Sequence, residues 1–132
     1  MNFLTGFVAV ILLASCGQRS TDEEQVRELI AAVETAAEAR DASDVLEHVD
    51  ANYSDGNGFD RAQLQNFLRA YFLANPKIEL LVRIESLEFP VDGLGQARVA
   101  VNALPSGDSV TLDVEFHRTG DTWSAVRADR SR

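Results

Sequence analysis

A single cysteine, Cys16, stands where an apolar stretch near the beginning of the chain ends. Residues 1–15 carry no charged side chain, and residues 7–14 form an unbroken apolar run. This stretch is long enough for the core of a signal peptide, whereas a helix needs roughly 20 apolar residues to span a bilayer. The pattern predicts that the chain is exported, with a thiol at the end of the export signal.

Leu13, Ala14 and Ser15 precede this cysteine, and the four residues together resemble the lipobox of bacterial lipoproteins. The resemblance implies that the thiol of Cys16 is lipidated, that residues 1–15 are removed as a signal peptide, and that the new amino terminus is acylated. Two or three acyl chains hold a protein stably at a membrane. Signal peptides usually begin with basic residues, which are lacking here, so the alternative is an ordinary secretory signal or a core helix with a chance cysteine.

The same resemblance predicts a location in the cell envelope. Gly17 rather than aspartate follows the cysteine, which in enteric-type sorting implies the outer membrane of a Gram-negative cell, facing the periplasm. Residues 16–21 are then a lipidated tether, and residues 22–132 form one domain. The formal net charge of −9 falls outside the uncharged signal, and an acidic surface argues against nucleic acid as a partner.

Three helices are predicted in the first half of this domain. Over residues 22–40, apolar side chains recur at i, i+3 and i+4, and overlapping capping-box patterns begin at Ser20 and Thr21. A shorter helix follows with Ser43 as its cap. The third covers residues 60–75, where its first residue is an aspartate cap and an Asn-Pro pair ends it.

After the third helix, the apolar period changes from 3.6 to 2, which is the period of a β-strand. Alternating runs occupy residues 78–89, 97–103, 110–117 and 122–129. In the first run the apolar phase slips between Ile84 and Leu87, as it does at a β-bulge. Short turns separate the runs, which predicts an antiparallel meander.

Three helices followed by four strands in about 110 residues resemble the NTF2-like (SnoaL-like) family, and residues 120–123, Gly-Asp-Thr-Trp, are similar to its common strand–turn–Trp ending. The resemblance implies an α+β cone in which about three N-terminal helices pack on a curved antiparallel sheet of four main strands. Another α+β roll, such as a cystatin-like fold with one main helix, is the alternative. The family includes isomerases, epoxide hydrolases, dehydratases and non-catalytic members, so the fold alone selects no function.

Enzymes with this fold generally place a carboxylate, tyrosine or histidine inside the cone, where desolvation tunes its pKa. The predicted strands offer no such group. In residues 110–117, Asp113, Glu115 and His117 lie on the face opposite the apolar side chains. If the apolar faces line the cone, the strands supply no general base to it.

The remaining candidates for a pocket are Tyr53, Asp55, Tyr71, Trp123 and Arg127. Isomerases of the family hold a Tyr–carboxylate pair, and Tyr53, Asp55 and Tyr71 are candidates for such a pair if they meet at the mouth of the cone. A core or turn role is the alternative. Trp123 and Arg127 share one face of the last strand, so Arg127 is a candidate for binding an anionic ligand. Its alternative role is on the rim, paired with an acid.

Neither a metal nor another cofactor is predicted. Residues 55–60 partly resemble a calcium loop, but the fifth, sixth and twelfth positions lack the required residues, which favours a turn followed by a helix cap. His48 and His117 lie in unrelated elements, without a second ligand at zinc-binding spacing.

These observations favour a non-catalytic domain on a lipid anchor that binds a small apolar ligand or an envelope protein, with a second copy meeting it through the sheet as another candidate partner. The alternative is a cone-pocket enzyme, such as an isomerase, epoxide hydrolase or dehydratase. Asp55 or Arg127 buried in a pocket with a shifted pKa is the sign of the enzyme. A filled cone with an exposed apolar patch is the sign of the binding domain.

Overall fold

The structure is a computed structural model, and it describes residues 21–91, 93–105 and 109–131. The predicted signal peptide, Cys16 and the tether up to residue 20 lie outside the described residues. No helix of the described part is long and apolar enough to cross a membrane.

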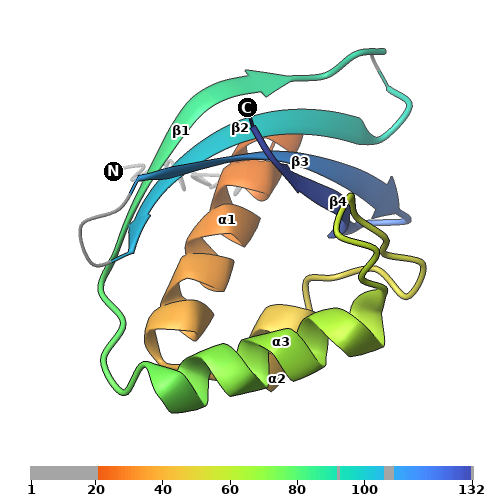
Figure 1. Ribbon diagram of the computed structural model, residues 1–132. Coiled ribbons are helices and arrows are strands. Elements are labelled where there is room, and N and C mark those ends of the chain that lie inside the picture. Colours follow the sequence, from red (N-terminus) through yellow and green to blue (C-terminus); the bar gives the residue numbers. More distant parts are fainter. Residues whose placement is uncertain (1–20, 92, 106–108, 132) are drawn as a thin grey trace, which may run out of the picture.

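Three helices precede four strands along the chain, as the sequence predicts. They are α1 (Asp22–Glu38), α2 (Ala42–Leu46), α3 (Arg61–Ala74), β1 (Leu80–Glu88), β2 (Gln96–Pro105), β3 (Val110–Thr119) and β4 (Thr122–Arg130). The strands form one antiparallel sheet in the order β1-β2-β3-β4. The sheet curves over α1, and α3 lies farther from it at the lower end of the molecule (Figure 1). The predicted α+β class and the meander are confirmed.

Side-chain caps fix where the two longer helices begin. The hydroxyl oxygen of Thr21 accepts a hydrogen bond from the backbone N–H of Glu24 at 3.2 Å, which starts α1. Asp60 and Gln63 form a complete capping box at the start of α3, with bonds of 2.8 and 2.9 Å. Both pairs satisfy N–H groups that a helix leaves without an internal partner.

The cap of α2 differs from the prediction. Asp41, not Ser43, is the N-cap, and its carboxylate accepts from the backbone N–H of Asp44 at 3.0 Å. Both residue types are good caps. Asp41 prevails because the chain turns just before it, at Arg40, leaving Asp41 extended and Ser43 already helical.

Arg40 joins the ends of α1 and α3. Its backbone has φ 58°, in the left-handed region that non-glycine residues enter at a cost of about 1–2 kcal/mol. Its guanidinium donates to the carbonyl oxygens of Phe72 at 3.1 Å and Pro76 at 3.0 Å. These hydrogen bonds hold the C-terminal end of α3 beside the end of α1.

Two β-bulges bend the sheet. In β1 the register shifts between Ile84 and Ser86, which confirms the bulge expected from the apolar phase. In β4, Arg127 pairs with Glu115 while Ala125 pairs with the next residue of β3, so Val126 is an extra residue. Bulges increase local twist and bend a strand, which helps the sheet to curl around the helices.

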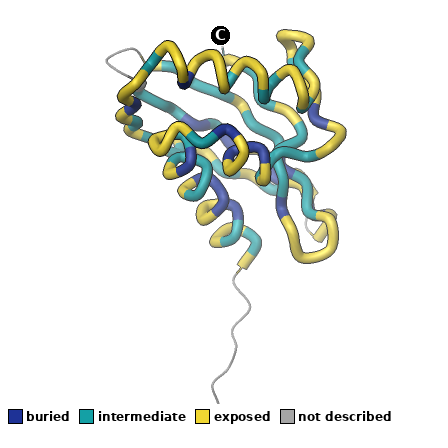
Figure 2. The backbone as a smooth tube through the Cα atoms, turned by 90° about the horizontal axis from the view of Figure 1, so that it is seen from below, coloured by how far each residue is buried: buried dark blue, intermediate teal, exposed yellow. Residues whose placement is uncertain are grey.

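The buried apolar side chains form two clusters. One joins α1 to the sheet and includes Val26, Val99, Phe116 and Trp123. The other joins the helices to Ile78 and the start of β1. Within α3 only Phe72 is buried, and the rest of this helix is exposed or half-buried (Figure 2). The two clusters leave space between α3 and the sheet.

Candidate functional site

A cavity of about 450 Å³ lies between the helices and the concave face of the sheet. Small-molecule sites typically measure about 300–1,000 Å³. Every strand residue that lines it is apolar: Leu80, Val82, Val101, Ala103, Val110, Leu112, Val114, Phe116, Ala125 and Ala128. The described strands therefore place no ionisable group in the cavity, as the alternation of residues 110–117 predicts.

Aromatic side chains of α3 form one edge of the cavity. Phe67 and Tyr71 both line it, yet they are 49% and 37% exposed, so they lie at its mouth. Their rings stack with centroids 6.2 Å apart, and Phe59 extends the row at 5.7 Å from Phe67. The mouth is thus an apolar, aromatic surface open to solvent.

Tyr53 is buried and lines the cavity, whereas Asp55 does not. The Tyr53 hydroxyl donates to a carboxylate oxygen of Asp55 at 2.7 Å, and the other oxygen accepts from the backbone N–H groups of Asn57 and Phe59. Burial, and then the bond to Asp55, raises the pKa of the Tyr53 phenol well above its ordinary value. Tyr53 thus stays neutral with its proton already engaged, and Asp55 holds the turn.

The segment that resembled a calcium loop uses its carboxylates for the backbone. Asp55 caps the turn and Asp60 caps α3, as the turn-and-cap interpretation predicts. Across the ranges that the structure describes, no three His, Cys, Asp or Glu side chains gather as a ligand set for a metal ion.

Trp123 and Arg127 do not line the cone cavity, and the prediction that they share one face of β4 is wrong. The extra residue Val126 reverses the alternation between them. Trp123 is buried in the core, where its indole N–H donates to Gln25 at 2.9 Å. Arg127 is exposed on the convex face and pairs with Asp129 beside a second hollow of about 340 Å³.

Asp129 attaches the turn that carries Tyr53 to the sheet. Its carboxylate accepts from the backbone N–H of Gly56 at 2.6 Å and from the guanidinium of Arg127. The bond from Gly56, followed by that from Arg127, lowers the pKa of Asp129 below its ordinary value of 3.8. The charged form is therefore the one that stabilises this attachment.

Asp129→Asn is expected to lower the melting temperature by roughly 2–4 °C at neutral pH and to change nothing in strong acid. Because the pKa of Asp129 is lowered in the folded state, its carboxylate stabilises the fold at pH values above the ordinary pKa of 3.8. This stabilisation is lost as the pH falls through the lowered pKa. Melting curves of both proteins at several pH values measure this, with the exposed Asp121→Asn as control. A difference in melting temperature between wild type and Asp129→Asn that stays constant down to about pH 2 contradicts this role of Asp129.

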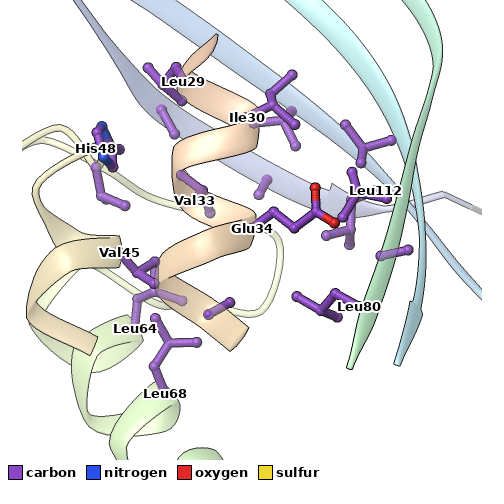
Figure 3. A pocket seen from close by; sticks show the side chains of 18 of the residues that line it. Leu29, Ile30, Val33, Glu34, Val45, His48, Leu64, Leu68, Leu80 and Leu112 are labelled. Carbon is purple, nitrogen blue, oxygen red and sulfur yellow. The ribbon is translucent and has the colours of Figure 1, made fainter. Parts of the chain in front are cut away.

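Glu34 is an ionisable residue of the cavity that the sequence argument missed. It lies on α1, is half-buried, and directs its carboxylate towards Leu112 and Leu80 of the sheet (Figure 3). Glu34 lies four residues after Ile30 and three before Ala37, and both of these residues line the cavity. Since such positions share one helix face, the spacing was a signal for Glu34.

His48 is the second ionisable residue that the sequence argument did not place in the cavity. It also lines the cavity but lies on the other side of α1 from the Glu34 carboxylate (Figure 3). The two side chains therefore do not form an acid–base pair.

Solved structures share this fold, although no protein-family model and no curated protein matches the chain. An NTF2-like protein of unknown function from Shewanella oneidensis is 16% identical with a TM-score of 0.66, covering 85% of this chain and 100% of its own. Another from Shewanella baltica is 10% identical with a TM-score of 0.66, covering 86% and 99%. A domain of unknown function with a cystatin-like fold from Nostoc punctiforme is 13% identical with a TM-score of 0.69, covering 86% and 78%. The chain has the predicted NTF2-like fold.

Proposed function

We propose that this protein is a lipid-anchored lipoprotein of the cell envelope whose cone cavity binds a small apolar ligand without catalysis. The observation that carries the binding function is the cavity of about 450 Å³, which is almost wholly apolar and opens between the aromatic side chains of α3. An apolar space of this size gives a ligand the free energy of leaving water, roughly 25 cal/mol for each Å² of apolar surface buried.

The anchor is proposed from the sequence. Leu13, Ala14, Ser15 and Cys16 resemble a lipobox at the end of an uncharged apolar run. The tether of residues 16–21 is short, so the cavity operates close to the membrane surface. An outer-membrane location facing the periplasm is part of this proposal, since Gly17 follows the cysteine.

A second candidate function, a cone-pocket enzyme, is favoured by Glu34 in the cavity. General acid–base chemistry on this fold needs groups that act together on one substrate. His48 lies across α1 from Glu34, and the hydroxyl of Tyr53 is engaged by Asp55. Arg127 and Asp55, whose burial in a pocket was the sign of an enzyme, do not line the cone cavity. These arrangements support binding over catalysis.

Ala103→Phe is expected to weaken binding of the neutral fluorescent probe N-phenyl-1-naphthylamine at least tenfold. Ala103 lies on β2 with its side chain in the cavity, so a phenyl ring there occupies the space that the probe needs. Fluorescence titration measures the affinity. An unchanged affinity, or a wild-type protein that does not bind the probe, contradicts the proposed function.

The matched control is Ala100→Phe. Ala100 lies on the same strand and lines the hollow of the opposite face, so the identical substitution leaves the cone cavity open. Its affinity for the probe is expected to stay within about twofold of wild type.

A further inference from the structure

The Glu34 carboxylate has no counterion within the described chain. No hydrogen bond or salt bridge joins it to a described residue, and none of the described residues that line the cavity is an arginine or lysine. Arg40 and Arg61, which tie the helical segments together, donate to backbone carbonyl oxygens instead. A half-buried carboxylate therefore faces an apolar space without a partner from its own protein.

A carboxylate in this position discriminates between ligands by charge. Apolar walls keep the effective dielectric low, so its attraction for a cation and its repulsion of an anion are larger than in water. The net charge of −9 acts in the same direction. A cationic group on the ligand supplies the partner that Glu34 lacks, with charge-assisted hydrogen bonds about twice as strong as neutral ones.

The Tyr53 hydroxyl offers no hydrogen bond to an anion, and His48 lies on the other side of α1 from the Glu34 carboxylate (Figure 3). The Tyr53 hydroxyl donates its hydrogen bond to Asp55, so the part of Tyr53 that contacts the cavity is its ring. Phe67, Tyr71 and Phe72 add further aromatic rings. Aromatic faces attract ammonium groups through their quadrupole. The aromatic rings and the Glu34 carboxylate thus both favour a cationic ligand.

From these observations we infer that the cavity selects apolar amines: molecules with a hydrocarbon body and one protonated amino group, which binds the carboxylate of Glu34. This inference rests on the proposed ligand-binding function and specifies its ligand class. The ammonium group lies at the Glu34 carboxylate, between α1 and the sheet, and the hydrocarbon body fills the apolar space beside it (Figure 3).

Three probes of equal chain length separate charge from apolar burial: nonylamine, nonan-1-ol and nonanoate. At pH 7 the first is a cation, the second is neutral and the third is an anion. The full chain is held in a non-ionic amphipol, empty amphipol serves as the blank, and calorimetry gives each affinity. The wild type is expected to bind nonylamine most tightly and nonanoate most weakly.

Glu34→Gln keeps the shape of the side chain and removes its charge. It is expected to weaken nonylamine binding roughly tenfold, which is the value of a charge-assisted hydrogen bond, and to change nonan-1-ol binding less than threefold. Glu38→Gln is the matched control, since it removes the same charge from an exposed position one turn further along α1 and is expected to change neither affinity.

Two failures are distinguishable in this experiment. If the wild type binds nonan-1-ol as tightly as nonylamine, or if Glu34→Gln weakens both equally, the amine preference is wrong while the apolar binding function stands. If the wild type binds none of the three probes, the proposed function fails, and the inference that rests on it fails as well.

Discussion

Val99→Asp is expected to abolish folding of the domain. Val99 is 2% exposed and lies in the cluster that joins α1 to the sheet. The substitution removes a buried valine, worth about 1.5–3 kcal/mol. It also buries a carboxyl group without a partner, which costs roughly 2–7 kcal/mol even in the neutral form. Together, the lost valine burial and the cost of the buried carboxyl group are comparable with the free energy of unfolding of a native domain, typically about 5–15 kcal/mol.

Urea unfolding of the domain that begins after Cys16, followed by circular dichroism, measures this effect. Leu81→Asp is the control because it introduces the same side chain at a strand position that is 60% exposed. The control is expected to retain a cooperative transition, destabilised by about 1 kcal/mol or less. If Val99→Asp also unfolds cooperatively near the wild-type midpoint, the assignment of the inner face of β2 is wrong.

Cys16→Ser is expected to abolish membrane anchoring and to leave the unprocessed precursor. A hydroxyl does not replace the thiol that forms the thioether with lipid, so the proposed modification has no acceptor. Metabolic labelling with a fatty-acid analogue should mark the wild type strongly and this variant not at all. Labelling that survives the substitution would refute lipidation at Cys16.

A second variant tests whether position, rather than any thiol, directs the modification. Cys16→Ser combined with Ser20→Cys moves the thiol four residues away from Leu13, Ala14 and Ser15. It is expected to remain unlabelled, because the lipobox resemblance depends on the residues directly before the cysteine.

Recovery of the wild type with inner-membrane markers would contradict the outer-membrane part of the proposal.

Much of the fold was predictable because its elements carry strong local signals. The Asp60–Gln63 capping box is encoded within four residues, and the structure forms it. In β3, large apolar side chains alternate strictly with polar ones, which fixed the face that lines the cavity. The bulge in β1 was visible since its large side chains, Ile84 and Leu87, reveal the change of phase.

The bulge in β4 carried no such signal. On either side of Val126 the inward residues are the small Ala125 and Ala128, whose burial contributes little, so the pattern does not reveal a slip. A regular strand was the simplest interpretation, and it placed Arg127 on the same face as Trp123. The face on which Arg127 lies is determined by the register between β4 and β3, which is a property of the tertiary structure.

Glu34 was missed for a related reason. A glutamate on the flank of an amphipathic helix is ordinarily exposed to solvent, so its spacing from Ile30 and Ala37 does not by itself place Glu34 in a cavity. Its place in a cavity depends on the distance between α3 and the sheet. That distance results from the packing of the whole domain and is not encoded in any one segment.

The extra residue in β4 also determines which changes of this cavity are open to evolution. A lineage that lost Val126 by deletion would keep every other side chain of the strand on its present face. A lineage that kept the residue but straightened the strand would turn Arg127 inwards, because a shift of one residue exchanges the two faces. The cavity would then hold Arg127 and its partner Asp129 as well as Glu34. A change of strand register alone, without any substitution, would thus bring an ion pair into a cavity to which the described strands now contribute only apolar side chains.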